Sequence, residues 1–525
     1  MAARLVMLIL ASSFSYSHLL LRTSKVRLLV FSLLLFLGCS TSTNNIINNN
    51  NNNNDDVVNG VEAGKISSTH HHVLKLNLRA FLEQRTAVFS SNSNSCFSQR
   101  SSRQTKGATI LELIHRDHCS GQKINWNDKA KKTLISDNAR VRSLQSRMKS
   151  LTSRHKDDAS EAQIPLTSGI KLQTLNYIVS VELGGRNMSV IVDTGSDLTW
   201  VQCQPCRICY FQQDPLFNPS LSPSYKSISC NSSTCRSLLF ETGNSGICSE
   251  TAPQLCNYVV SYGDGSYTRG ELGLETLNLG TTSVSDFVFG CGRNNKGLFG
   301  DASGLMGLGR SSVSLVSQTS TMFGGVFSYC LPSADAASAG SLVFGGDSSV
   351  YKNSTPISYT NIIPKPQLPT FYFLNLTGIS IGKVALESPS FGKSGILIDS
   401  GTVITRLPPS MYSALKSEFL RQFSGFPSAP GFSILDTCFN LSSYQEVDVP
   451  EIKMHFGGGA EMVVDVMGVM YFAKSDPSQV CLAVASLTYE DDVGIIGNYQ
   501  QKNQRIIYDS KGYKLGFAKE TCSFA

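Results

Sequence analysis

The 525-residue sequence lacks long hydrophobic runs and has little histidine outside its first 160 residues. No apolar stretch reaches the roughly 18 to 20 residues that a membrane span needs, which excludes a polytopic membrane protein. Seven of the eight histidines precede residue 161, so His455 is the one histidine of the remainder. A multi-histidine zinc site cannot be built there, and Ser–His–Asp or Cys–His chemistry would depend on that residue. We therefore expect any enzyme in this part to use carboxylates as acid–base groups.

Charge and cysteine are unevenly distributed along the chain. Residues 1–160 carry 22 Lys and Arg against 10 Asp and Glu, a net charge of +12, whereas residues 161–525 carry 23 against 29, a net charge of −6. A basic leader thus precedes an acidic body, and nucleic-acid binding by the body is not expected. Twelve of the 15 cysteines lie in the body. This even number, together with an apolar N-terminal segment, predicts disulfides and an oxidising compartment.

The start of the leader has the pattern of a targeting segment. The apolar run from Leu28 to Gly38 follows three basic residues and is followed by small ones, which is typical of a secretory signal peptide within residues 1–40. The 27 residues before the run contain no acidic side chain and several Ser and Arg, a composition also found in transit peptides. We expect a secreted, apoplastic or vacuolar protein, with the chloroplast as the alternative.

Residues 41–160 are expected to hold a low-complexity spacer and a basic propeptide. The Asn-rich tract 48–54 has nothing to bury. Residues 108–118 begin with the alternation of a strand, and apolar residues from Leu134 to Leu151 recur at helical spacing, with Asn127 or Asp128 as a possible cap. Arginines and lysines occupy the other positions. This segment is either a solvated basic helix or a propeptide that covers the acidic body until acid protonates its carboxylates.

The body contains an internal repeat within a mainly β pattern of short strands and turns. The segment VIVDTGS at 190–196 recurs as ILIDSGT at 396–402, and a second apolar–glycine stretch follows each copy, at 304–309 and 494–498. Two such pairs in the same order indicate two homologous halves, which we place at 161–355 and 356–525.

Each repeat ends an apolar strand with Asp, a hydroxyl residue, Gly and a second hydroxyl residue. A buried Asp is costly unless its charge is shared or hydrogen-bonded. Gly permits a tight turn, and the hydroxyls can donate to the carboxylate. If the two loops meet, Asp193 and Asp399 lie close together, and because like charges repel, the pair holds one proton over an acidic pH range. One carboxyl group then acts as acid and the other as base on a water between them.

These motifs resemble those of the pepsin-like aspartic endopeptidases, and more closely the plant nepenthesin-like branch, over residues 164–522. Residues 111–117 are similar to propeptides of that branch. The resemblance implies a mainly β, bilobal acid-protease fold with two β-barrel-like lobes and a cleft between them. It also implies a monomer that cleaves polypeptide substrates at acidic pH, needs no cofactor or metal and is inhibited by its own propeptide. The catalytic residues would be Asp193 and Asp399.

The resemblance extends to residues around the two aspartates. The supporting residues of the active-site loops would be Thr194, Gly195, Ser196, Ser400, Gly401 and Thr402. In the segment SYGDGS at 261–266, Tyr262 and Gly263 would belong to a flap that closes over substrate. Trp200 matches the tryptophan that follows the first motif in that family and would belong to the same set of flap and substrate-binding residues. A plain β-hairpin turn is the simpler interpretation of this segment and is compatible with a flap.

The cysteines follow the same branch. Three of them form the spacing CxxCxxC, which in isolation suggests zinc, but no histidine is near and disulfides are favoured. The pairing implied by the resemblance is Cys203–Cys206, Cys209–Cys291, Cys230–Cys256, Cys235–Cys248, Cys330–Cys522 and Cys438–Cys481. Five glycosylation sequons agree with secretion, at Asn187, Asn231, Asn353, Asn375 and Asn440. The chain is too short after Asp399 for a saposin-like insert, so membrane contact is not expected.

Two other functions share this fold. One is a non-catalytic binding or inhibitor protein, which typically has lost part of the catalytic machinery, whereas both Asp motifs and Tyr262 are present here. The other is a chloroplast nucleoid DNA-binding protease. Phosphate binding depends on clustered Lys and Arg, so the negative body disfavours DNA binding by the mature protein.

Overall fold

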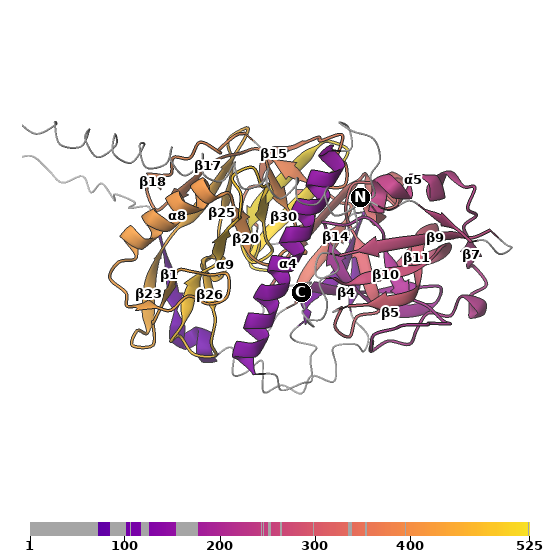
Figure 1. Ribbon diagram of the computed structural model, residues 1–525, viewed down its shortest axis with the longest axis horizontal. Helices are drawn as coiled ribbons and strands as arrows, with labels where there is room; N and C mark the ends of the chain where they lie inside the picture. Colours follow the sequence, from indigo (N-terminus) through magenta and orange to yellow (C-terminus); the bar gives the residue numbers. More distant parts are fainter. Residues whose placement is uncertain are drawn as a thin grey trace, which may run out of the picture. The chain divides into compact units, whose positions relative to one another are not determined.

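The computed structural model describes residues 72–83, 101–116 except 106, 125–153 and 177–525, the last range with gaps at 243, 245, 250–253, 263–264, 298, 334–338, 352–353, 394, 523 and 525. Residues 1–69, which include the predicted signal peptide and Asn-rich spacer, lie outside the described residues. The described part is mostly β-strand (Figure 1), which confirms the predicted fold class. None of its helices is both long and apolar enough to cross a membrane.

The strands of the N-terminal lobe pack around two hydrophobic clusters, one of which continues into the C-terminal lobe, and short helices connect the strands. Its long hairpin of β10 and β11 pairs with β9, β7, β4 and β6. The strands are β4 (Tyr177–Leu183), β5 (Arg186–Asp193), β6 (Trp200–Gln202), β7 (Lys226–Ser227), β8 (Ile247–Cys248), β9 (Cys256–Ser261), β10 (Tyr267–Leu279), β11 (Thr282–Lys296) and β12 (Gly304–Gly307). The helices are η3 (Pro219–Leu221), α5 (Ser233–Thr242), α6 (Leu315–Gln318) and α7 (Ser320–Phe323).

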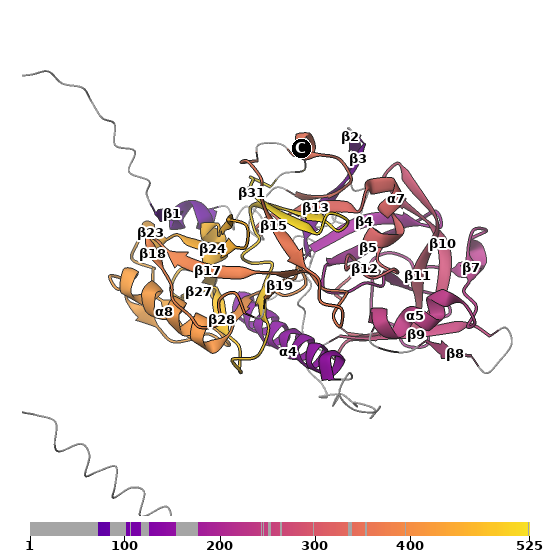
Figure 2. The ribbon, with the colours of Figure 1, turned by 90° about the horizontal axis from the view of Figure 1, so that it is seen from above.

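The C-terminal lobe contains three groups of strands and the helix α8 (Figure 2). One group consists of β15 (Ser358–Ile363), β16 (Phe373–Leu374), β19 (Ile396–Ile398), β29 (Gly494–Ile496), β20 (Thr405–Leu407) and β28 (Val484–Ser486). The second is β18 (Val384–Ala385), β17 (Leu376–Ile381), β24 (Ile452–Phe456) and β25 (Ala460–Val463), and the third is β21 (Ser428–Ala429), β22 (Cys438–Phe439), β27 (Val480–Leu482) and β26 (Met470–Phe472). Its helices are α8 (Pro409–Gln422) and α9 (Val466–Val469), and the short η4 (Ser348–Val350) lies near the end of the N-terminal half.

The sequence repeat corresponds to a structural repeat. In the first copy β5 runs parallel to β12, and β6 is antiparallel to β12. In the second copy β19 runs parallel to β29, and β20 is antiparallel to β29. The glycines of the second stretch are required where the chains cross: a Cβ at Gly304 would lie 1.9 Å from the Trp200 carbonyl oxygen, and one at Gly497 would lie 2.4 Å from that of Val403. The lobe boundaries themselves stay a prediction.

A seven-stranded antiparallel sheet joins the two lobes, and the leader contributes to it. Its order is β2 (Ser102–Thr105), β3 (Ala108–His115), β14 (Gly340–Phe344), β13 (Val326–Cys330), β30 (Gln504–Asp509), β31 (Lys514–Lys519) and β15. The strand β3 confirms the strand that the alternating pattern at the start of residues 108–118 predicts. A third leader strand, β1 (Val73–Asn77), pairs with β23 (Glu446–Pro450). The leader is therefore built into the sheets of the body rather than laid loosely on its surface.

The predicted leader helix is α4 (Trp126–Ser153), which runs between elements of the two lobes (Figures 1 and 2). Its apolar stripe is buried against the C-terminal lobe. Val141, Leu144 and Met148 pack in one cluster with residues of β16, β19 and β29, and Leu134 packs in another with residues near β20. The cap differs from the prediction, because the Asn125 side chain accepts the second backbone N–H of the helix. The helix is thus not a solvated basic helix.

Six disulfides are present in the described part, and two of the predicted pairs, Cys330–Cys522 and Cys438–Cys481, are confirmed. The other four predictions are wrong. In place of Cys203–Cys206 and Cys209–Cys291, the structure pairs Cys203 with Cys291 and Cys206 with Cys209. The reason lies in the strands: β6 runs beside β11, and the Cys203 N–H donates to the carbonyl of Gly292 at 2.9 Å. All three sulfurs of CxxCxxC are therefore disulfide-bonded and are not thiolate ligands.

The disulfides of the Cys-rich insertion around α5, residues 230–256, also differ from the prediction. In place of Cys230–Cys256 and Cys235–Cys248, the structure pairs Cys230 with Cys248 and Cys235 with Cys256. Cys248 and Cys256 lie directly opposite each other on β8 and β9. The buried Cys256 meets Cys235 on the inner face of α5, while the exposed Cys248 meets Cys230 before the helix.

Candidate active site

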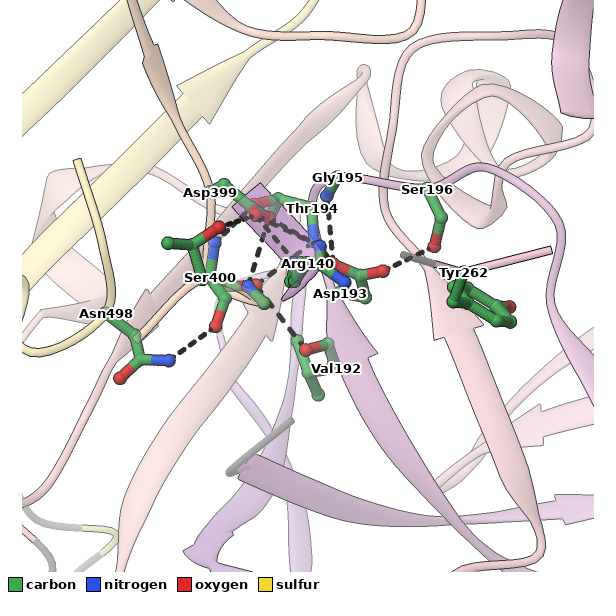
Figure 3. Close-up of polar contacts among 12 residues, drawn as sticks. Arg140, Val192, Asp193, Thr194, Gly195, Ser196, Tyr262, Asp399, Ser400 and Asn498 are labelled. Atoms are coloured by element: carbon green, nitrogen blue, oxygen red, sulfur yellow. Dashed lines mark hydrogen bonds and ion pairs between the residues drawn. The ribbon is translucent and has the colours of Figure 1, made fainter. Parts of the chain in front are cut away.

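The two predicted catalytic aspartates face one common space. Asp193 ends β5 and Asp399 follows β19, and both side chains are fully buried. One nitrogen of the Arg140 guanidinium lies 2.7 Å from Asp193 Oδ1 and 3.0 Å from Asp399 Oδ2. Because one nitrogen atom contacts both carboxylates, the two carboxylates lie close together in one site and do not occupy separate pockets (Figure 3).

The glycine of each loop supplies both a hydrogen-bond donor and the room for the opposite carboxylate. The Gly195 N–H donates to Asp193 Oδ1 at 3.1 Å, and the Gly401 N–H donates to Asp399 Oδ1 at 3.0 Å. A Cβ at Gly195 would lie 2.6 Å from Asp399 Oδ1, and one at Gly401 would lie 2.4 Å from Asp193 Oδ1. Any larger residue at these positions would force the two loops apart.

The outer hydroxyls hold the two carboxylates in matching ways. Ser196 Oγ donates to Asp193 Oδ2 at 2.7 Å, and Thr402 Oγ1 donates to Asp399 Oδ2 at 2.6 Å. Each aspartate thus receives one backbone and one hydroxyl hydrogen bond from its own loop, which orients the carboxylate and partly offsets the cost of burying it.

The inner hydroxyls connect the two loops to each other. The Thr194 N–H donates to Ser400 Oγ at 3.0 Å, and the Ser400 N–H donates to Thr194 Oγ1 at 2.9 Å. Ser400 Oγ also lies 3.4 Å from the Val192 carbonyl, and Asn498 Nδ2 donates to the Ser400 carbonyl at 2.9 Å. Each hydroxyl thus accepts the backbone N–H of the residue that carries the other hydroxyl. These two hydrogen bonds connect the two halves next to the aspartates (Figure 3).

Trp200 and Tyr262 lie together beside the first aspartate loop. The fully buried Trp200 donates its indole N–H to the Tyr262 hydroxyl at 2.7 Å, and both rings contact Phe299 edge-on. Burial raises the pKa of Tyr262, so its phenol stays neutral. The Tyr262 N–H donates to the Ser266 carbonyl at 2.8 Å, which closes the β9–β10 hairpin. Gly263, the other predicted flap residue, lies outside the described residues.

The sequence did not single out Arg140, which lies between the two aspartates. Its Nε donates to Asp399 Oδ2 at 3.1 Å, in addition to the contacts of its terminal nitrogen. Burial alone lowers the pKa of Arg140, but the charges of Asp193 and Asp399 outweigh this and raise it, so the guanidinium stays charged. A leader side chain therefore occupies the centre of the site.

The local environment also sets the proton affinity of Asp193. Burial raises its pKa, and the charge of Asp399 adds to the rise, whereas Arg140 and the hydrogen bonds from Ser196 and Gly195 oppose it. A pair of this kind binds one proton more readily than an isolated carboxyl group does. His455, the body's one histidine, lies on β24 and contacts Ser380 and Glu461. The acid–base groups assembled here are therefore carboxylates, as the composition predicts.

One turn before Arg140, Asp137 makes a second buried contact that the sequence did not reveal. Its carboxylate accepts hydrogen bonds from the backbone N–H groups of Val403 at 2.6 Å and Ile404 at 3.2 Å. It also pairs with Arg406 at 2.7 Å. Val403 and Ile404 follow Thr402 directly, so the second leader contact adjoins the aspartate site.

Comparisons with known proteins agree with this arrangement. Family models described as xylanase inhibitor N-terminal and xylanase inhibitor C-terminal match residues 177–346 and 371–519. Among solved structures, the basic 7S globulin from soybean is 21% identical with a TM-score of 0.52, covering 66% of this chain and 92% of that one. Conglutin gamma from lupine seeds is 18% identical with a TM-score of 0.51, covering 65% and 90%. At these identities the likeness shows the fold alone.

Curated relatives show the family. An aspartyl protease family protein of Arabidopsis thaliana is 42% identical over 452 residues, which cover 84% of this chain and 92% of the relative. The aspartyl protease AED1 of the same plant is 36% identical, covering 85% and 93%. Nepenthesin-1 of Nepenthes gracilis, an aspartic proteinase, is 34% identical over 69% of this chain and 82% of its own length. With this similarity and its two matched aspartate loops, the chain belongs to the plant pepsin-like aspartic protease family.

Proposed function

We propose that this chain is an aspartic-type endopeptidase, made as a zymogen, that hydrolyses peptide bonds of polypeptides at acidic pH. The observation that carries the proposal is the pair of matched loops that directs two buried carboxylates, Asp193 and Asp399, at one point. Aspartic protease family membership supports the same activity. The intact loops disfavour a non-catalytic binding protein.

The chemistry follows from one proton shared by two carboxyl groups. The ionised member takes a proton from a water molecule, whose oxygen attacks the carbonyl carbon of the scissile peptide bond. The protonated member donates to the carbonyl oxygen, which becomes a hydroxyl of a gem-diol. When the carbon–nitrogen bond breaks, the leaving nitrogen takes the proton that the first carboxylate removed from water. The other carboxylate, now ionised, takes a proton from one hydroxyl of the diol, which becomes a carboxyl group, and the pair again holds one proton. The residues alone can carry out these steps, so the proposed reaction requires no metal or organic cofactor.

Helix α4 would keep the enzyme inactive before activation. The Arg140 guanidinium occupies the space between the carboxylates that the attacking water needs. Further along the helix, Gln145 exchanges two hydrogen bonds with the backbone of Val493, and Lys149 pairs with Asp492 at 2.7 Å. Basic side chains of the leader thus form ion pairs with carboxylates of the body. This pattern supports the propeptide as an inhibitor whose hold weakens when acid protonates those carboxylates.

The six disulfides support folding in an oxidising compartment, and we propose a secreted, apoplastic or vacuolar location in preference to the chloroplast. The negative charge of the body favours polypeptide substrates over nucleic acid as its partners. A monomer remains the expected state.

The test is to express the full chain in an oxidising compartment, purify it near neutral pH and acidify it in the presence of an unfolded protein substrate. Mass spectrometry would follow the leader and the substrate, with and without pepstatin, an inhibitor of paired-aspartate proteases. We expect acid to trigger loss of the leader and cleavage of the substrate, and pepstatin to block the cleavage. A folded chain that cleaves nothing between pH 2 and 7, or cleavage indifferent to pepstatin, would contradict the proposal.

A further inference from the structure

The first described segment of the leader, residues 72–83, lies on the C-terminal lobe, and we call it the arm. Its strand β1 pairs with β23 along all five of its residues (Figures 1 and 2). At one end the Leu78 N–H donates to the Gln445 carbonyl at 2.9 Å, and at the other the Glu451 N–H donates to the His72 carbonyl at 3.2 Å. Within the part of the chain that the structure describes, β1 is the only strand that pairs with β23. A strand of the body thus has its backbone partner in the leader.

The arm also completes part of the hydrophobic core of the body. Leu76 and Leu78 are 2% and 1% exposed, and Leu76 lies directly opposite the buried Val447 of β23. Phe81 is buried as well, and its ring stacks on that of Phe472 with 4.0 Å between the centroids. Removal of the arm would therefore expose apolar side chains beside a strand edge without a partner, a combination that promotes aggregation.

Asn77 ends the strand of the arm and begins the helical residues 78–83. Its side-chain oxygen accepts the Ala80 N–H at 2.8 Å, as the side chain of a helix N-cap does. Leu78 and Phe81 are three residues apart and therefore lie on the same face of the helical turn. Strand and turn thus present their apolar side chains to the body together.

The charged groups at the arm contribute little to its binding. They form five ion pairs at 2.8 to 3.7 Å: Lys75 with Glu446 and with Asp448, His72 with Glu451, which also pairs with Lys453, and Arg79 with Glu83 within the arm. The pairs of Lys75 and Arg79 join side chains that are all more than half exposed. Exposed ion pairs add little stability, so protonation of these carboxylates in acid removes little of what holds the arm.

Helix α4 is held in a different way. Its Arg140 and Asp137 form ion pairs with the body in which every side chain is at most 7% exposed. Protonation of a carboxylate in such a pair leaves a buried cation without a counter-charge, which is costly. Acid therefore weakens the hold of α4 more than that of the arm, whose contacts are backbone hydrogen bonds and apolar side chains.

We propose that a fragment containing the arm stays bound to the C-terminal lobe after acid has released α4, as a non-covalent subunit of the activated enzyme. This inference rests on the proposed zymogen and names the part of the leader that the enzyme keeps. The arm is the occupant that the structure favours for the edge of β23, because it is already seated there and is made in equal amount with the body. A second copy of the chain would first have to displace it.

The experiment follows the arm through activation of the wild-type full-length chain. The chain is acidified until α4 has been cleaved away and is then passed over a size-exclusion column at the same pH. Mass spectrometry identifies the peptides in the peak of the body. We expect a fragment that contains residues 72–83 to co-elute with the body in equal amount. Its absence from that peak would overturn the proposal.

Variants assign the retention to the apolar contacts. Phe81→Ser removes the ring that stacks on Phe472, and the retained fragment should fall at least about tenfold. Arg79→Gln changes a side chain of the same turn that is 75% exposed, and its fragment should be retained as in the wild type. A synthetic peptide of residues 72–83 should bind the processed Phe81→Ser protein and raise its Tm, whereas the same peptide with Ser in place of Phe81 should not. Full retention of the Phe81→Ser fragment would overturn the proposal.

Hydrogen exchange tests the arm even if no processing takes place. It is measured at pH 7 and pH 4 on the full-length chain carrying Asp193→Asn, with correction for the chemical exchange rate at each pH. At pH 4 the amides of β1 should keep their protection, and those of α4 should exchange at least about tenfold faster than at pH 7. Loss of protection in β1 together with α4 would overturn the retained arm and leave the endopeptidase function standing. A protected β1 in a wild-type chain that cleaves nothing would overturn the endopeptidase function and leave the contact of the arm standing.

Discussion

Each of the two paired aspartates is oriented by its own loop, and the glycine of the other loop leaves the room that its carboxylate needs. Thr194 and Ser400 bond reciprocally, so a change in one loop is transmitted to the other. The sequence could predict these residues because the two loops repeat the same short pattern. It could not predict Arg140, which is one of several arginines in the leader. The signal that could have found it is its spacing, because Arg140 lies four residues before Leu144 and therefore on the same face of the helix as that buried residue.

Replacement of Arg140 tests its role as the group that blocks the aspartates. Arg140→Gln removes the charge that bridges Asp193 and Asp399, and breaking a buried ion pair costs about 3 to 5 kcal/mol. We expect the leader of this variant to be lost at least about tenfold faster at pH 5 than that of the wild type, as followed by mass spectrometry.

The matched control is Arg142→Gln, because Arg142 lies on the same helix but is exposed. Its leader should be lost at the wild-type rate. Equal rates for the two variants would show that only the overall positive charge of the leader matters, and would contradict the specific role of Arg140.

At the scale of elements, local patterns predicted strands and helices better than long-range partners. The apolar periodicity from Leu134 to Leu151 predicted α4, and alternation predicted β3. The pairing of four disulfides was wrong because it depends on which strands adjoin: Cys203 reaches Cys291 only because β6 runs beside β11. The Asp137–Arg406 pair joins residues 269 apart in sequence, and no local pattern links them.

The insertion around α5 provides a test at this scale. Non-reducing peptide mapping should recover Cys235 linked to Cys256 and Cys230 linked to Cys248. The double replacement Cys235→Ala with Cys256→Ala should destabilise the insertion by about 3 kcal/mol, since it releases a loop of about 20 residues, and should lower the Tm measured by calorimetry.

Recovery of Cys230 linked to Cys256 would contradict the arrangement of β8, β9 and α5. The double replacement Cys206→Ala with Cys209→Ala is the comparison, because its loop spans three residues and its removal should cost less.

At the scale of the whole molecule, the duplicated sequence predicted the bilobal fold, since two copies of one unit must pack as two similar halves. How the leader enters that fold could not be predicted, because β3 and β1 pair with strands distant in sequence. The leader is thus positioned by two strands and a helix, and it places Arg140 and Asp137 at the aspartate site.

The pH dependence of the activated enzyme follows from the paired carboxyl groups. Catalysis requires one proton on the pair. With the leader in place, burial raises the pKa of Asp193 and the charge of Asp399 adds to the rise, whereas the charge of Arg140 opposes it. In the activated enzyme that opposing charge has left with the leader, while Asp399 still faces Asp193 and still favours one shared proton. The proton is therefore held to a higher pH than on an ordinary Asp, and activity should be highest in acid and fall as the pH rises through the raised pKa. Initial rates on a neutral peptide between pH 2 and 8 would check this, and flat activity up to pH 8 would contradict it.

The most direct test of the paired-aspartate site is the kcat/KM of Asp193→Asn and of Asp399→Asn, measured on the processed proteins at pH 4. A matched control is Asp286→Asn, which changes an exposed aspartate of the N-terminal lobe. We predict that each active-site variant loses at least about a thousandfold in kcat/KM while keeping the wild-type Tm within a few degrees, and that the control stays fully active. Near-native cleavage by either active-site variant would show that the two carboxylates do not form the catalytic pair.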